Sequence, residues 1–270
     1  MSNAAVIRMD EPRPSERFMW ITPDRVLYVG LLGAPAVRTM GCVIVYMAAE
    51  GATRVRINGG EWQAGPMAVV QPFVPHQVAT DARTVHVLMV EAETVDLGAL
   101  PAPLAACGVV HDSAFVKRVR GVLQEMGAQG RSLDLAQIDF DTMFVGRQLA
   151  CRHMDPRIQR VTDTIRRDPS IMAAAADCAE SVHLSFSRFL HLFRQDVGAP
   201  FRSFRTWKRA RSLLHYVNRD ANLTHVALDT GYPDSTHFSH SIRHVYGLKP
   251  KDIFAGSRRL AIYASEQRPA

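Results

Sequence analysis

The fold of the C-terminal part of this chain is decided by the stretch Leu223-Thr-His-Val-Ala-Leu-Asp-Thr-Gly-Tyr232. Apolar residues at helical spacing predict a helix up to Thr230, and Gly231-Tyr232-Pro233 then supplies a turn. Either residue of Asp234-Ser235 is a good N-cap for a second helix, which we expect to close at Gly247. Two helices joined by so short a turn predict a helix-turn-helix unit.

The second helix of this unit has an apolar side and a polar side. Phe238 and Ile242 fall at the spacing of residues that face a core. The polar side carries side chains that can hydrogen-bond to base edges or phosphates, and these are our DNA-contact candidates: Ser235, Thr236, His237, His240 and Arg243. A metal ion shared by His237, His240 and His244 is the alternative, but no carboxylate or cysteine accompanies them at metal-ligand spacing. We therefore predict no metal there.

The same plan occurs earlier in the chain. Ile171–Glu180 predicts a helix of small residues, Ser181–Leu184 a turn, and Ser185 the N-cap of a helix from Phe186 to Val197. The DNA-contact candidates on this helix are Ser187, Arg188, His191 and Arg194. Between the units, Pro200–Val217 predicts one long helix, which would hold the two recognition helices (the second helix of each unit) at a fixed separation.

These two units resemble the DNA-binding domain of the AraC/XylS family of transcriptional regulators. The resemblance covers about residues 157–256 and rests on the blocks Leu184–Arg194, Gly198–Arg202, Trp207–Ala210, Leu223–Arg243 and Tyr246–Pro250. It implies base-facing positions for six residues: Ser187, Arg188, His191, Ser235, Thr236 and His240. The family often has arginine where His191 and His240 stand, so its base preference cannot be carried over to this chain.

Two recognition helices on one chain match the geometry of a DNA duplex. A major groove admits one helix, and two helices about 34 Å apart can enter successive grooves on one face. Arg194 and Arg243, which come later in each helix, are expected to contact phosphates. Arg205, Arg209 and Arg211 on the intervening helix either contact phosphates as well or form a solvated face. We predict double-stranded DNA, a promoter or operator, as the partner, with RNA polymerase as a further partner.

The charge of the chain supports this division. Residues 1–150 carry a net charge of −2, whereas residues 151–270 carry +8 and eight of the eleven histidines. A basic module attached to a nearly neutral one is typical of a polyanion binder with a sensor or oligomerisation domain.

The first half of the chain favours β structure. Thr53–Asn58 alternates polar and apolar residues, and Thr84–Val90 is another strand candidate. Short strands broken by glycine and proline predict a small sandwich or barrel. Residues Gly65, Pro72, Pro75 and His76 resemble the second motif of cupins, which implies a cupin-like domain. Since residues 30–58 contain no histidine, the metal-ligand set of a cupin enzyme is missing.

Two residues of this half are candidate ligand contacts, His76 and Trp62. For His76 the alternative is a structural histidine near a turn, which satisfies its own hydrogen bonds.

The hydrophobic period changes near residue 112. Asp112-Ser113 predicts the N-cap of a helix that Gly127–Gly130 breaks. A second apolar helix is expected through Leu135, Ile138, Phe144 and Leu149. These two helices either pack on the β unit or form a dimer seam.

The predicted fold class is therefore α+β. It comprises a cupin-like β-barrel or sandwich at residues 1–105, a helical connector at 106–152, an all-α domain of seven helices with two helix-turn-helix units at 153–257, and a tail at 258–270.

We expect a transcriptional regulator controlled by a small-molecule effector in the first domain, with no cofactor and no catalytic residues. The alternatives are a degenerate cupin enzyme with a DNA-binding tail, an alkyl-transfer repair protein, and a regulator controlled by a partner protein or constitutively active. Among oligomers a homodimer has the highest base rate. Residues 1–18 lack the apolar core of a signal peptide, and the longest apolar run, Met40–Ala49, is about half of a membrane span. Four scattered cysteines fit a cytoplasmic protein without a membrane partner.

Overall fold

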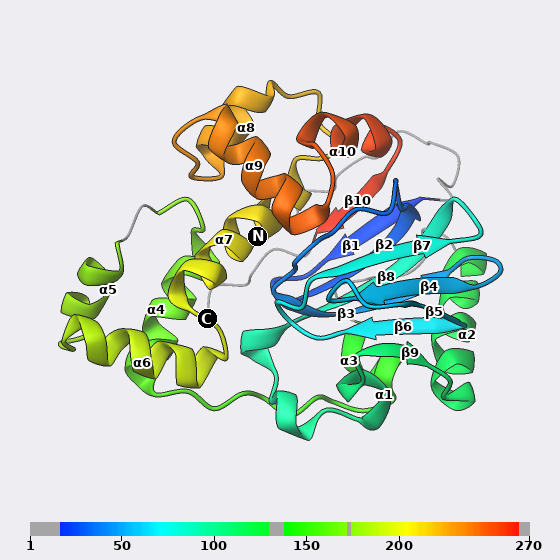
Figure 1. Ribbon diagram of the computed structural model, residues 1–270, viewed down its shortest axis with the longest axis horizontal. Helices are drawn as coiled ribbons and strands as arrows, with labels where there is room; N and C mark the ends of the chain where they lie inside the picture. The colour runs from blue at the N-terminus through cyan, green and yellow to red at the C-terminus, as the bar shows by residue number, and fades with distance from the viewer. Residues whose placement is uncertain (1–16, 130–137, 172–173, 265–270) are drawn as a thin grey trace, which may run out of the picture.

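The computed structural model describes residues 17–129, 138–171 and 174–264 of the 270-residue chain. A β domain comes first, connecting helices follow, and a helical region with two helix-turn-helix units completes the chain (Figure 1). The predicted α+β class and the order of its parts are thus confirmed.

The β domain contains two sheets. The larger sheet has the order β10-β1-β2-β8-β3-β6-β9, with the strands β1 (Phe18–Ile21), β2 (Arg25–Leu31), β3 (Cys42–Ala48), β6 (Met67–Val70), β8 (Thr84–Glu91), β9 (Gly108–Val110) and β10 (Ala261–Ala264). The smaller sheet has the order β5-β4-β7, with β4 (Thr53–Ile57), β5 (Trp62–Gly65) and β7 (His76–Thr80). All neighbouring strands are antiparallel except β1 and β10. The two strands predicted from alternation are β4 and β8.

Both faces of the larger sheet are buried. Along β3, Ile44 and Tyr46 belong to a core that includes residues of the smaller sheet and of the C-terminal helices. Val43 and Val45 belong to a second core, on the other face, together with residues of the connecting helices. A strand buried on both faces loses the polar alternation of a half-exposed strand, which explains the uninterrupted apolar run at Met40–Ala49.

Short helices connect the β domain to the second half: η1 (Ala92–Thr94), η2 (Leu97–Ala99), α1 (Ala102–Ala105), α2 (Ser113–Gln129) and α3 (Phe140–Val145). Asp112 caps α2 as expected, but this helix continues through Gly127 instead of breaking there. The second connector helix is shorter than expected. Only α3 forms in the described residues, and Gly146 ends it with φ +85°. Leu135 lies outside the described residues.

The apolar side of α2 packs on the sheet, which is one of the two arrangements expected for this helix. Phe115, Val116 and Val119 are buried in the same core as Trp20 and Leu27 of the sheet.

The helical region has seven α-helices among its described residues, as expected: α4 (Pro156–Arg167), α5 (Ala175–Ser181), α6 (Phe186–Val197), α7 (Phe201–Ser212), α8 (Leu223–Asp229), α9 (Ser235–Tyr246) and α10 (Pro250–Ser257). The long helix predicted at Pro200–Val217 is wrong at its C-terminal end. Helix α7 stops at Ser212 and continues as a short 3-10 turn, η4 (Leu213–His215). None of the helices in the described part of the chain is long and apolar enough to cross a membrane.

The segment 258–270 was expected to be a tail, but its described part contributes a strand. β10 pairs in parallel with β1, in the register Phe18 to Ala261 and Ile21 to Ala264. The end of the helical region is therefore joined to the edge of the first sheet.

Candidate functional site

The first helix-turn-helix unit consists of α5 and α6. The side chain of Ser185 accepts a hydrogen bond from the backbone of Arg188 at the start of α6, and Gly198 ends this helix with φ +80°. In the turn, His183 adopts φ +55° and the Leu184 amide donates to the Ala179 carbonyl at 2.9 Å. Helix α6 has the predicted bounds, whereas the first helix is shorter than the expected Ile171–Glu180.

The second unit, α8 and α9, repeats this geometry. The Asp234 side chain accepts hydrogen bonds from the amides of Thr236 and His237, both at 2.8 Å, so Asp234 is the N-cap. The Tyr232 amide donates to Ala227, and the turn residue with positive φ is Gly231. Ala227 thus occupies the position of Ala179 in the first unit, and both are buried where the two helices approach.

All nine DNA-contact candidates are exposed: Ser187, Arg188, His191 and Arg194 on α6, and Ser235, Thr236, His237, His240 and Arg243 on α9. The opposite sides of the two helices are buried through Phe189 and Phe193 and through Phe238 and Ile242. His237 differs from the others because its Nδ1 is 2.7 Å from Asp234 Oδ2. These contacts hold the pKa of Asp234 below its usual value.

Within the described residues, no group of three or more His, Cys, Asp or Glu side chains could hold a metal ion. His237 pairs with Asp234, but among the described residues no third side chain of these types joins that pair.

Three arginines of α7 make hydrogen bonds to other parts of the protein. Arg205 donates to the Ile171 carbonyl at 3.0 Å and Arg209 to the Pro169 carbonyl at 3.4 Å, so both contact the segment that follows α4. Arg211 is buried and donates to Glu91 at 3.0 Å. A phosphate contact for Arg211 is therefore excluded in this arrangement, because its guanidinium is directed into the β domain.

Arg211 belongs to a buried ionic cluster between the β domain and α7. Glu91, at the end of β8, accepts hydrogen bonds from Trp207 Nε1 at 2.7 Å and Lys208 Nζ at 2.5 Å as well as from Arg211. Glu93 also contacts Lys208. Burial alone would raise the pKa of Glu91, but the adjacent cations outweigh it and lower that pKa, whereas burial prevails at Glu93 and raises its pKa.

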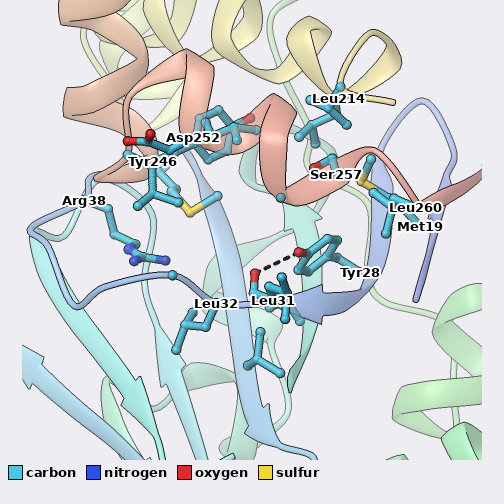
Figure 2. Close-up of a pocket in the computed structure, with 18 of the residues that line it drawn as sticks. Met19, Tyr28, Leu31, Leu32, Arg38, Leu214, Tyr246, Asp252, Ser257 and Leu260 are labelled. Atoms are coloured by element: carbon cyan, nitrogen blue, oxygen red, sulfur yellow. Dashed lines mark hydrogen bonds between the residues drawn. The ribbon is translucent and has the colours of Figure 1, made fainter. Parts of the chain in front are cut away.

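A cavity of about 420 Å³ lies between the β domain and the second unit (Figure 2). Strands β1, β2, β3 and β8 supply one side, and residues that follow α7 or belong to α9 and α10 supply the other. The lining is mainly apolar, with Met19, Ile44 and Val87 from the strands facing Leu214 and Ile253 from the helical region. Its volume falls in the range of small-molecule sites.

Among the described residues that line this cavity, Arg38 is the buried cation. Its guanidinium Nε and Nη2 atoms are buried, and within the described part of the chain neither has a hydrogen-bond partner. A buried guanidinium with free donors is costly unless an acceptor arrives, so this position is suited to an anionic group. The sequence offered no motif that would have pointed to Arg38.

The two residues predicted to contact a ligand lie outside the cavity lining, so this prediction is corrected. His76 is buried with 2% exposure and is hydrogen-bonded through both ring nitrogens, to Tyr46 Oη and to the Val74 carbonyl, each at 2.8 Å. Burial lowers its pKa to about 4, which fits the neutral structural histidine of the alternative interpretation. Trp62 lies on β5 and is 42% exposed, away from the cavity.

Comparison with known proteins agrees with this geometry. Residues 178–256 match the family described as "Helix-turn-helix domain". The invasion protein InvF of Salmonella typhi and that of Salmonella typhimurium strain LT2 are each 32% identical over 75 residues, which is 27% of this chain and 35% of the relative. The chain thus matches about a third of the length of these curated relatives.

Among solved structures, ToxT of Vibrio cholerae O395 superposes with a TM-score of 0.57 at 8% identity, covering 86% of this chain and 96% of ToxT. Unsaturated fatty acid-bound ToxT of Vibrio cholerae strain SCE256 gives 0.54 at 10% identity, covering 86% and 95%. At this identity the likeness shows a shared fold. Together with the family match, it shows a helix-turn-helix domain at the C-terminal end of a fold shared with ToxT.

Proposed function

We propose that this protein is an AraC-type regulator that reads a specific operator with α6 and α9 in successive major grooves, because residues 178–256 match a helix-turn-helix family and contain both helices. The observation that carries the proposal is the exposure of all nine candidate side chains on two helices of equivalent geometry. Neutral histidine makes weaker base contacts than bidentate arginine, so we expect His191 and His240 each to contribute a small part of the discrimination between bases.

A selection from random duplex DNA tests this proposal. The wild-type protein should enrich two short elements about one helical turn apart. A single neutral hydrogen bond contributes about 0.5–1.5 kcal/mol, so the loss of two in His191→Ala/His240→Ala should weaken binding to the selected duplex by about fivefold or more. Its binding to unrelated duplex should stay within about twofold of wild type, since neither change removes a phosphate-binding arginine. Steeply salt-dependent binding of the wild type without a consensus would contradict the proposal.

We further propose that an apolar molecule with a carboxylate occupies the cavity and controls DNA binding. The apolar lining would take the hydrocarbon body, and the free donors of Arg38 would take the carboxylate. ToxT, which shares the fold, has been solved with an unsaturated fatty acid and with (E)-4-(8-methylnaphthalen-1-yl)but-3-enoic acid, two carboxylic acids with apolar bodies. These two complexes of ToxT support the ligand class proposed for this chain.

Titration with a long-chain unsaturated fatty acid and with its methyl ester measures the role of Arg38. Charge-assisted hydrogen bonds contribute about 1.5–3 kcal/mol, so Arg38→Met should weaken binding of the acid by about ten- to hundredfold. The ester should bind both proteins with similar affinity, because it lacks the anionic group. Trp62→Ala is the control outside the cavity and should bind the acid as the wild type does. Equal affinity of Arg38→Met and wild type for the acid would exclude Arg38 as the anchor.

A further inference from the structure

The second recognition helix is attached to the segment that carries Arg38. This segment, Gly33–Gly41, joins β2 to β3. The backbone amide of Thr39, the residue after Arg38, lies 3.1 Å from the His244 carbonyl and 3.2 Å from the Val245 carbonyl. Both carbonyls belong to the last turn of α9, where helix carbonyls lack intrahelical partners.

A close backbone approach adds to this hydrogen bond. Gly247, which ends α9 with φ +73°, lies against Ala36 and Val37. A Cβ atom placed there would lie 3.1 Å from the Ala36 carbonyl oxygen and 3.2 Å from that of Val37, closer than nearly all real contacts. The end of α9 is thus seated on the segment, a contact that we call the α9 clip (Ala36–Thr39 with His244–Gly247).

The same segment is fixed on its other side to the smaller sheet. The Arg38 amide donates to the His76 carbonyl at 2.9 Å, and the His76 amide donates to the Arg38 carbonyl at 3.0 Å. The Arg38 side chain, in contrast, lines the cavity beside Tyr246, the last residue of α9 (Figure 2). Any shift of Arg38 toward a bound anion would therefore be passed to Thr39 and to the end of α9.

The first recognition helix has no such attachment in the described part of the chain. Gly198, which ends α6 in the same left-handed conformation, faces the guanidinium of Arg152, whose nearest atom would lie 3.2 Å from a Cβ atom placed on this glycine. Arg152 Nη1 donates to the Ala92 carbonyl at 3.2 Å, so the end of α6 reaches the β domain through a side chain. A side chain yields more easily than the two backbone carbonyls at Gly247. The first unit also has its own core, which contains no residue of the β domain among the residues that the structure describes.

We infer that the α9 clip transmits effector binding to the second recognition helix alone, so that the effector alters the reading of one of the two operator elements. This inference rests on the proposed function, since it takes the cavity as the effector site and α9 as a DNA-reading helix. For this coupling the two states of the clip must differ in their affinity for the effector. The two guanidinium nitrogens of Arg38 that have no hydrogen-bond partner within the described residues, Nε and Nη2, provide the group that would respond.

Gly247→Ala tests the inference, with Gly198→Ala as the matched control. Both replace a left-handed helix-terminal glycine and carry a similar backbone strain, but only the first inserts a methyl group into the clip. The measurement is the ratio of operator Kd values with and without a saturating unsaturated fatty acid. Couplings between sites are typically fivefold or more, so we expect about that ratio in wild type and Gly198→Ala, and a ratio near one in Gly247→Ala. Direct titration with the acid checks that each variant still binds it.

Hydrogen exchange on the wild-type protein provides a second measurement that needs no variant. The fatty acid should change exchange in residues 31–41 and in 235–247 together, and leave 186–198 unchanged. An equal response of both recognition helices, or full coupling in Gly247→Ala, would overturn the inference while leaving the proposed function intact. If the wild type binds neither the acid nor a specific operator, the proposed function itself fails.

Discussion

Replacing Glu91 by glutamine should lower the free energy of unfolding by about 3–5 kcal/mol. Glu91 is 1% exposed and is the shared acceptor of Trp207, Lys208 and Arg211. Its neutralisation leaves Lys208 and Arg211 buried, and within the described residues Glu93 remains as an acidic partner of Lys208; an uncompensated buried charge is strongly destabilising. Denaturant unfolding of the purified wild type and variant at one pH measures the change.

Two further variants distinguish the loss of the buried ionic cluster from the loss of a negative charge in general. Asp81→Asn weakens the exposed ion pair with Arg54 and should lower stability far less than Glu91→Gln does, because solvent screens exposed charges. The double variant Glu91→Gln/Lys208→Met removes one charge of each sign, so it should recover most of the lost stability. If Glu91→Gln is no less stable than Asp81→Asn, the cluster does not hold α7 to the β domain.

The predictions from sequence were most accurate where the structure is determined by neighbours along the chain. Helix α6 was predicted to the residue, because Ser185 caps its start and Gly198 adopts the left-handed conformation at its end. In the second unit the sequence leaves the N-cap open between Asp234 and Ser235; the structure assigns it to Asp234, and Gly247 ends the helix as expected. Each of these contacts joins residues a few positions apart, so the local sequence is sufficient to determine where the helix starts and ends.

The errors come from contacts between distant residues. Arg211 was weighed as a phosphate contact, yet its partner Glu91 is 120 residues away in sequence. The pattern of α7 shows a basic helix face, and only the fold reveals that this face is directed toward the end of β8. Arg38 and the cavity were missed for the same reason: the lining comes from four strands and from helices of the other domain. His76, in contrast, stood in a recognisable motif but satisfies its hydrogen bonds locally.

The repeated sequence plan also concealed a difference between the two units. Phe189 on α6 and Phe238 on α9 occupy equivalent positions and are both fully buried. Phe189 belongs to a core formed by α4, α5, α6 and the start of α7. Phe238 belongs to the core that includes the strands of the β domain and the cavity wall. Equivalent residues therefore support different parts of the molecule.

Phe189→Ala and Phe238→Ala should consequently lower the free energy of unfolding by similar amounts but destabilise different parts of the molecule. Each deletes a buried aromatic ring, which costs about 3–5 kcal/mol. The tryptophans are Trp20 and Trp62 in the β domain and Trp207 in the shared core, so their fluorescence does not report on the first unit directly. In Phe189→Ala we expect helix loss by circular dichroism at a lower temperature than the fluorescence transition, with fatty acid binding retained.

In Phe238→Ala the two transitions should instead move down together, and affinity for the fatty acid should fall, because α9 and α10 line the cavity. Ligand titration below the transition and paired thermal scans of both variants distinguish these outcomes. Coincident transitions in Phe189→Ala would mean that the first unit is coupled to the β domain through α7 and the ionic cluster as tightly as the second is through its core. In that case an effector bound in the cavity would act on both recognition helices, and the two operator elements would respond alike.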